Sequence, residues 1–181
     1  MKYHTCIAIL GLPLLPTVSP GASAYAGQEG RDIKALSADE VNAYLSGEGM
    51  GLARAAELNG YPGPKHVLEL SGELELSPEQ RERTESLFTS MQAKSIALGR
   101  ALIDEERKLD RLFAGKSATP DRLSAALARI GNLQARLRGA HLEAHLDQSR
   151  ILTPEQIERY DQVRGYASGG DDADHRRHTH P

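Results

Sequence analysis

The sequence is poor in the residues that often hold small secreted or β-rich proteins together. Among 181 residues it has one cysteine, Cys6, and no tryptophan, and aromatic residues amount to 4%. Cys6 lies in a segment that we expect to be removed, so the mature chain is predicted to have no disulfide framework. No segment alternates β-branched and polar residues, whereas Ala, Leu, Glu, Arg and Gln are abundant. This composition predicts an all-α fold.

Motifs that would indicate an enzyme are also missing. The sequence shows no nucleophile–base pair and no CxxC motif. The glycines of residues 47–51 lack both a preceding strand and the Lys-Ser/Thr pair of a phosphate-binding loop. We therefore expect a protein without enzymatic activity.

The first 24 residues resemble a secretory signal peptide. Lys2 supplies a positive charge, and the apolar run from Cys6 to Leu15 is too short to span a membrane. Small residues at 22–24 offer a cleavage site near Ala24, and a second site lies near Ala26. Since no twin-arginine pair is present, the segment predicts ordinary export and a periplasmic location.

The charge of the predicted mature chain is mildly acidic. Removal of residues 1–24 takes away one of the 22 basic residues and no acidic one, which leaves 21 basic against 25 acidic residues. This balance argues against a nucleic-acid partner. Residues 168–181 carry three histidines and three aspartates without an apolar anchor, so we expect a disordered tail. The tail is interpreted either as a weak metal chelator or as a solvated segment without a specific role.

Two long helices joined by a short loop are predicted for the centre of the chain. The first begins at Pro78 and ends near Gly115; the second begins after Thr119 and continues to about Ser149. A loop of about five residues between them requires an antiparallel hairpin. Apolar residues repeat along the first helix, at Leu87, Met91, Leu98, Leu102, Leu109 and Phe113. In the second helix we expect the apolar residues to face inward, at Leu123, Leu127, Ile130, Leu133, Leu137 and Ala140.

Short helices are expected on either side of the hairpin. One starts at the capping sequence of residues 37–40, and others are predicted for residues 52–58, 65–74 and 154–166. We assign residues 25–64 to an N-terminal helical extension and residues 65–167 to the main helical domain. Because a two-helix hairpin has too few layers to bury two apolar stripes, we also predict a homodimer.

Three histidines are candidate metal ligands. His141 and His145 are four residues apart on a helix, so their imidazoles lie on one face and can bind one ion. The residues between them match neither the HExxH nor the HxxEH motif of metalloproteases, so no hydrolytic centre is implied. His66, with Glu69 on the same face, is the third candidate. The alternative is that His141 and His145 are two partly solvated polar residues near the end of the hairpin.

A basic stripe accompanies the apolar stripe of the second long helix. Arg122, Arg129 and Arg136 follow one another at seven-residue spacing. One interpretation is a client-binding surface that attracts acidic segments of unfolded proteins. The other is an ordinary solvated helix face, with intrachain partners among residues 104–106.

The same five-residue motif occurs on both sides of the hairpin, at residues 76–80 and 152–156. Ser77 or Thr153 is a suitable helix N-cap, the following proline suits the first helical position, and Gln80 or Gln156 can complete a capping box. Leu76 and Leu152 open the two copies. Each copy of the motif therefore predicts the start of a helix.

With its all-helical composition and predicted export, this Leu-Ser/Thr-x-x-Gln repeat resembles the LTxxQ motif of the Spy/CpxP family. The resemblance implies a cradle-like helical dimer with ATP-independent chaperone activity on unfolded envelope proteins and a role in envelope stress signalling. It also implies a membrane sensor's periplasmic domain as a partner. Related members, CnrX and ZraP, bind heavy metals through histidines, so a periplasmic metal sensor with Zn, Ni or Cu at His141, His145 and His66 is the alternative function.

Overall fold

The computed structural model describes residue 21 and residues 23–166. Most of the predicted signal peptide and the whole segment 168–181 therefore lie outside the described residues. The chain divides into two compact units, residues 1–31 and 32–181. In the described part of the first unit, successive turns are closed by backbone hydrogen bonds such as that from Gln28 N–H to Tyr25 C=O.

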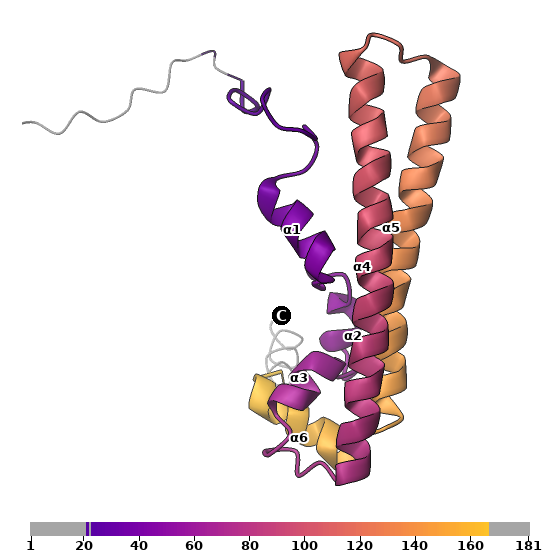
Figure 1. Ribbon diagram of the computed structural model, residues 1–181. Coiled ribbons are helices and arrows are strands. Elements are labelled where there is room, and N and C mark those ends of the chain that lie inside the picture. The colour runs from indigo at the N-terminus through magenta and orange to yellow at the C-terminus, as the bar shows by residue number, and fades with distance from the viewer. Residues whose placement is uncertain (1–20, 22, 167–181) are drawn as a thin grey trace, which may run out of the picture. The chain divides into compact units, whose positions relative to one another are not determined.

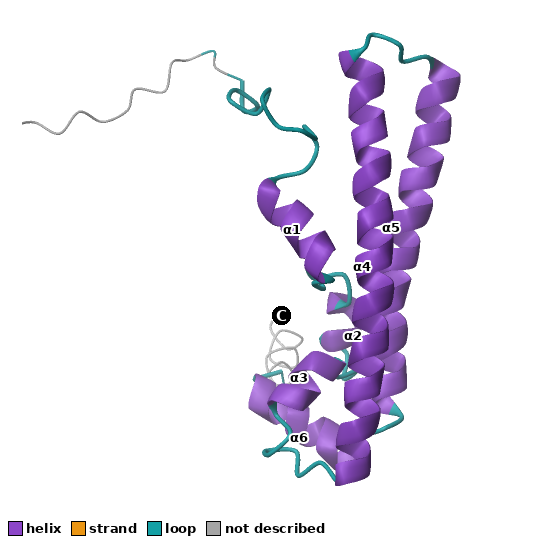
Figure 2. Ribbon diagram, in the orientation of Figure 1, coloured by secondary structure: helices purple, strands orange, loops and turns teal. Residues whose placement is uncertain are grey.

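The second unit is all-α, as the composition predicts (Figure 2). Its helices are α1 (Ala38–Ser46), α2 (Arg54–Glu57), α3 (Pro64–Glu69), α4 (Pro78–Ala114), α5 (Pro120–Ser149) and α6 (Pro154–Arg164). The described residues contain no strand and no helix that is both long and apolar enough to cross a membrane. The positions of the long helices confirm the predicted antiparallel hairpin of α4 and α5 (Figure 1).

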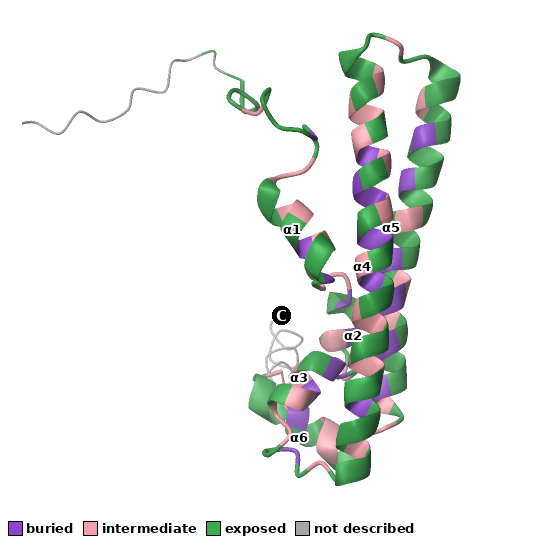
Figure 3. Ribbon diagram, viewed as in Figure 1, coloured by how far each residue is buried: buried purple, intermediate pink, exposed green. Residues whose placement is uncertain are grey.

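The hairpin is closed by an apolar core near its middle. Leu98 and Leu102 of α4 pack with Ile130, Leu137 and Ala140 of α5. The prediction that Leu127 of α5 faces inward is wrong, because Leu127 is 50% exposed. Phe113, at the end of the apolar stripe of α4, is 57% exposed. Both lie toward the loop end of the hairpin, where the two helices stand without a third layer (Figure 3). Two helices alone can cover only the sides that face each other.

Helix α1 packs against α4 at a position that only glycine can occupy. A Cβ on Gly99 would lie 2.5 Å from the carbonyl oxygen of Tyr44 and 3.0 Å from its Cβ. The absence of a side chain therefore allows the backbone of α1 to approach α4 directly. Ser37 caps α1 in the predicted capping box with Glu40.

Both copies of the repeated motif begin helices, as the sequence predicts. Ser77 and Thr153 accept hydrogen bonds from Gln80 N–H and Gln156 N–H, and each glutamine side chain accepts one from the N-cap N–H. Because the hairpin is antiparallel, the start of α4 and the start of α6 lie at the same end of the molecule (Figure 1). The two glutamine side chains also contact each other there, with 2.8 Å from Gln80 Nε2 to Gln156 Oε1.

A second apolar cluster fixes α6 and α3 to this end. It contains Val67, Leu74, Leu152 and Tyr160, which are all buried, with Ile157 packed against it. Helix α3 ends at Glu69 rather than at residue 74 as predicted. The chain instead forms tight turns across residues 70–76, in which Leu76 N–H donates to Ser71 C=O. Leu74 reaches the core from this turn rather than from a helix.

Candidate metal site

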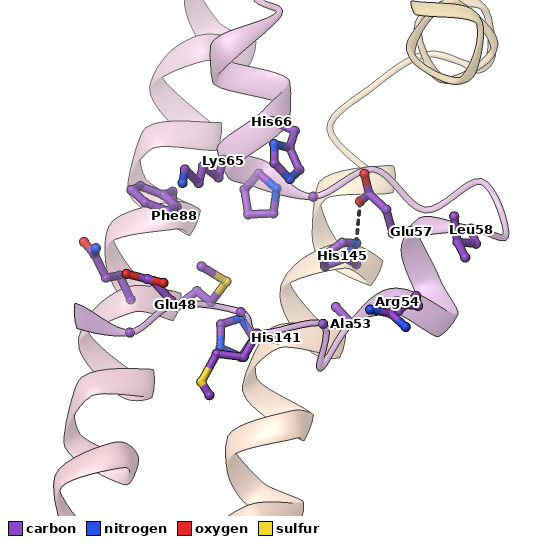
Figure 4. Close-up of a pocket in the computed structure, with 18 of the residues that line it drawn as sticks. Glu48, Ala53, Arg54, Glu57, Leu58, Lys65, His66, Phe88, His141 and His145 are labelled. Atoms are coloured by element: carbon purple, nitrogen blue, oxygen red, sulfur yellow. Dashed lines mark ion pairs between the residues drawn. The ribbon is translucent and has the colours of Figure 1, made fainter. Parts of the chain in front are cut away.

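A cavity of about 640 Å³ is bounded by α4, by α5 and by the segment that contains α2 and α3. All three predicted histidines line it, together with two methionines, two glutamates, two cations and the glycine-rich loop before α2 (Figure 4). The residues used below are Glu48, Gly49, Met50, Arg54, Glu57, Gly63, Lys65, His66, Met91, His141, His145 and Tyr166. The fold thus brings together residues as far apart in the sequence as Glu48 and Tyr166.

His145 is the most tightly positioned of the three histidines. It is 8% exposed, and its Nδ1 lies 2.7 Å from the carbonyl oxygen of Tyr61. Because a carbonyl can only accept, Nδ1 carries the proton and Nε2 of the neutral ring keeps a lone pair. This is the arrangement of many metal-binding histidines, in which the second nitrogen donates to a carbonyl that fixes the ring.

Glycine at position 63 leaves room beside the free edge of the His145 ring. A Cβ there would lie 2.9 Å from His145 Cε1 and 3.0 Å from Nε2. The backbone of Gly63 has φ −85°, a conformation open to any residue, so contact with the ring rather than backbone strain favours glycine here. Gly63 precedes Pro64, the first residue of α3, and therefore sets the helix against the histidine.

Glu57 at the end of α2 connects His145 to α6. Its Oε1 accepts hydrogen bonds from the hydroxyls of Tyr160 and Tyr166, and Arg164 lies 3.6 Å away. Its Oε2 is buried without a hydrogen-bond partner and lies 3.6 Å from His145 Nδ1. Burial and the hydrogen bond to Glu57 raise the pKa of Tyr160, which keeps that hydroxyl protonated as a donor. An orphaned carboxylate oxygen beside a buried imidazole is a site that a cation or an ordered water would satisfy.

His141 lies one helical turn before His145 and faces the glycine-rich loop. It is 3% exposed, and its Nε2 lies 3.2 Å from the hydroxyl of Ser95 on α4. With Nε2 as the donor, Nδ1 retains a lone pair on the side of Gly49, where a Cβ would lie 3.7 Å from this nitrogen. Burial, and secondarily the nearby His145, lower the pKa of His141. A neutral imidazole is the form that binds metal.

His66 lies at the more open side of the cavity. Its Nδ1 is 2.9 Å from Glu69 Oε2, as the three-residue spacing predicts, and its side chain is 35% exposed. The hydrogen bond from His66 lowers the pKa of Glu69. His66 therefore also has one nitrogen that is held and one that is available.

Sequence reasoning missed several residues of the site. Glu57 lies in a four-residue helix without periodicity, and Met50 lies in the loop that the sequence shows only as a break. Met91 is one of the predicted apolar positions of α4, yet it lines the cavity. Thioether sulfurs are soft donors suited to copper, so these methionines extend the range of metals that the cavity can attract.

The donors fit a transition metal in kind. Two buried imidazoles with held second nitrogens, an orphaned carboxylate oxygen and two thioethers suit zinc, nickel or copper better than calcium or magnesium. Within residues 21 and 23–166, no three His, Cys, Asp or Glu side chains converge closely enough to hold an ion together. His141 and His145 would supply two ligands of such an ion, and the remainder would come from other groups.

The predicted basic stripe is exposed and partly engaged within the chain. Arg129 forms an ion pair with Glu105, with 2.7 Å between Nε and Oε2. Arg122 donates to the carbonyl of Ser117, and Arg136 is exposed. Arg129 thus has one of the intrachain partners considered from the sequence.

Comparison with known proteins gives one match. The family model described as heavy-metal resistance matches residues 49–159, which is more than half of the chain. The matched region includes part of the glycine-rich loop, the hairpin, all three histidines and the first half of α6. No curated protein and no solved structure matches the chain.

Proposed function

The chain belongs to the heavy-metal resistance family, within the Spy/CpxP group, and from this premise we propose that it is an exported protein that binds a transition-metal ion in the cavity beside α5. In this proposal it acts in the periplasm as a sensor or accessory protein and catalyses no reaction. His145 Nε2 and His141 Nδ1 are the first ligands, and Glu57 and His66 are the nearest further donors.

The observation that carries this proposal is the hydrogen bond from His145 Nδ1 to the Tyr61 carbonyl. It fixes the tautomer and the direction of the ring before any ligand binds. Such preorganisation lowers the conformational entropy lost on binding. The bound ion would act as a Lewis acid that draws the surrounding side chains together. The chain's own contribution is to hold two imidazoles in a largely buried place.

A competition titration tests the metal site. The chain from residue 25 onward is titrated with Zn²⁺, Ni²⁺ or Cu²⁺ against a chromophoric chelator. We expect binding of one ion that is lost in the double variant His141→Ala/His145→Ala and survives deletion of residues 168–181. If the double variant binds as the wild type does, or if only the deletion removes binding, the proposed site is wrong. Circular dichroism of the double variant checks that the helices remain.

We propose chaperone activity as a second function, supported by apolar side chains that remain exposed on the long helices. Phe113, Leu127 and Leu146 are 57%, 50% and 46% exposed. Arg122 and Arg136 of α5 are exposed cations that can attract acidic segments of an unfolded client. We also propose that the chain forms the homodimer that the sequence predicts.

Aggregation of a denatured client, followed by light scattering without ATP, tests this second function. We expect suppression at near-stoichiometric ratios, with weaker suppression by Leu127→Ser. Absence of suppression both with EDTA and with added Zn²⁺ would reject the chaperone proposal and leave the metal site untouched. Sedimentation at several concentrations tests the dimer separately.

A further inference from the structure

The metal cavity is larger than a bare ion requires. Its volume of about 640 Å³ lies within the range of about 300–1,000 Å³ that is usual for small-molecule sites. A transition-metal ion with nitrogen ligands at about 2.0–2.1 Å fills only a small part of such a space. The cavity therefore has room for a small molecule beside the ion.

The cavity also offers fewer donors than such an ion uses. Zinc sites have about four ligands, whereas α5 contributes the two imidazoles of His141 and His145. In the part of the chain that the structure describes, no group of three His, Cys, Asp or Glu side chains is placed to hold an ion. Even if Glu57 joins the two histidines, a coordination position is left for a donor from a second molecule.

The charges around the cavity favour an anion as that second molecule. Two acidic and two basic residues line it: Glu48, Glu57, Arg54 and Lys65. Both acidic side chains accept hydrogen bonds, Glu48 from Ser46 and Glu57 from Tyr166. The two basic side chains are exposed and form no ion pair with a described residue. Because a divalent ion adds two positive charges to this balanced lining, a carboxylate that accompanies the ion is attracted.

The two unpaired cations lie on different sides of the α5 histidines (Figure 4). A Cβ on Gly51 would lie 3.3 Å from Arg54 Nη2, so the guanidinium group lies against the glycine-rich loop. Lys65 directly precedes His66 in α3, at the more open side of the cavity. A guanidinium fork and an ammonium group are both suited to binding carboxylates. Two such groups around one cavity suit a molecule with more than one carboxylate.

We propose that the cavity takes up the ion as a complex with a small polycarboxylate rather than as a bare ion. This inference rests on the proposed metal-binding function and names the chemical form of the metal. In the complex, His141 and His145 bind the ion, and carboxylates of the chelator occupy its other positions. Carboxylate oxygens that do not bind the ion face Arg54 and Lys65.

Equilibrium dialysis of radiolabelled citrate tests the proposal in the chain from residue 25 onward. Zn²⁺ is kept in slight excess over citrate, so that citrate does not strip the ion from the protein. We expect the protein to retain one citrate per chain with Zn²⁺ and none without it. Labelled EDTA should not be retained with Zn²⁺, because this chelator leaves the ion no position for the histidines.

The variant Arg54→Gln/Lys65→Gln separates binding of the complex from binding of the ion. Without citrate it should bind Zn²⁺ at least as tightly as the wild type, because two cations are removed from the lining. Its affinity for citrate in the presence of Zn²⁺ should fall roughly tenfold or more. Arg100→Gln/Arg138→Gln removes two exposed arginines outside the cavity and is the matched control, with citrate retention like that of the wild type.

Binding of Zn²⁺ without retention of citrate would overturn this inference and leave the proposed function standing. Retention of citrate without Zn²⁺ would also overturn it, because the chelator would then bind independently of the ion. Equal retention by Arg54→Gln/Lys65→Gln and the wild type would place the complex away from these two cations and would overturn it as well. A wild type that binds neither Zn²⁺ nor the complex would contradict both proposals.

Discussion

Gln80 and Gln156 form a reciprocal amide pair that ties the two ends of the hairpin together. Gln80 Nε2 lies 2.8 Å from Gln156 Oε1, and Gln156 Nε2 lies 3.1 Å from Gln80 Oε1. Each Nε2 also donates to a backbone carbonyl, that of Ile151 for Gln80 and that of Leu74 for Gln156. Each Oε1 additionally accepts the N-cap N–H of its own helix. The two copies of the motif therefore start two helices, and their glutamines also join α4 to α6.

Replacement of either glutamine should destabilise the protein more than loss of a helix cap alone. Gln80→Ala and Gln156→Ala each leave a partly buried carbonyl and a partner amide without a hydrogen bond, which costs about 1–3 kcal/mol. Gln134→Ala, an exposed helical glutamine of α5, is the matched control and should change stability little. Urea unfolding measures all three.

The double variant Gln80→Ala/Gln156→Ala tests whether the two residues act together. Since the partners have already lost each other in either single variant, the double loss should be clearly smaller than the sum of the single losses. If the loss of stability in the double variant equals the sum of the two single losses, the two residues contribute independently, which would contradict the pairing of the two glutamines.

Gly99→Ala should separate α1 from α4. The new methyl group would lie 2.5 Å from the carbonyl oxygen of Tyr44, and because that atom belongs to the backbone it cannot turn away. We expect a loss of about 1–3 kcal/mol and faster hydrogen exchange across residues 38–46. Gly131→Ala on α5 meets nothing within 4 Å and should instead stabilise the protein by roughly 0.5–1 kcal/mol. Equal effects of the two substitutions would argue against the close approach.

Two adjacent glutamates should respond to pH in opposite directions. Burial raises the pKa of Glu106 above its ordinary value of 4.5, so this carboxyl favours folding below that pH and the contribution is lost as pH rises through the folded pKa. Glu106→Gln should therefore gain stability over the wild type at pH 7.5, with the gain vanishing near pH 4.

Hydrogen bonds from Lys108 and Arg129 lower the pKa of Glu105, so its contribution is present above pH 4.5 and is lost as pH falls through the folded pKa. Glu105→Gln should lose stability at pH 7.5, by less than about 1 kcal/mol because its partners are exposed. Urea unfolding from pH 4 to pH 7.5 compares the two variants. The same sign for both would contradict the assigned environments.

Gly63→Ala should weaken metal binding without unfolding α3. The methyl group presses on the Cε1–Nε2 edge of His145, which is the edge that we assign to the ion. We expect the affinity for Zn²⁺ to fall roughly tenfold or more, in the range that displaced supporting groups produce. Gly72→Ala meets nothing within 4 Å and serves as the control. An unchanged affinity in Gly63→Ala would show that the ion does not use this edge.

Most of the helices could be predicted from local signals in the sequence. The caps at Ser77 and Thr153, the prolines after them and the short loop predict α4, α5 and α6 because each acts within a few residues of the chain. The pairing of Gln80 with Gln156 and the contact at Gly99 could not be predicted from the sequence, because they depend on how distant segments pack together. The error at Leu127 has the same origin, because helical periodicity shows which residues share a face but not whether anything covers it.

The candidate site, too, could be predicted only in part from the sequence. The four-residue spacing of His141 and His145 predicts a shared face, and the structure places both in one cavity with His66. The groups that orient them do not follow from any spacing. Tyr61 acts through its backbone carbonyl, Glu57 lies in a single helical turn, and Gly63 matters through the side chain it lacks.

The most direct test is a long-range ¹H–¹⁵N NMR spectrum of the imidazole nitrogens during addition of Zn²⁺. The account predicts that Nε2 of His145 and Nδ1 of His141 change to metal-bound shifts with one equivalent of Zn²⁺, while Nδ1 of His145 stays protonated on the Tyr61 carbonyl. Binding of Zn²⁺ with the nitrogens of both residues unchanged would contradict the claim that this cavity is a metal site.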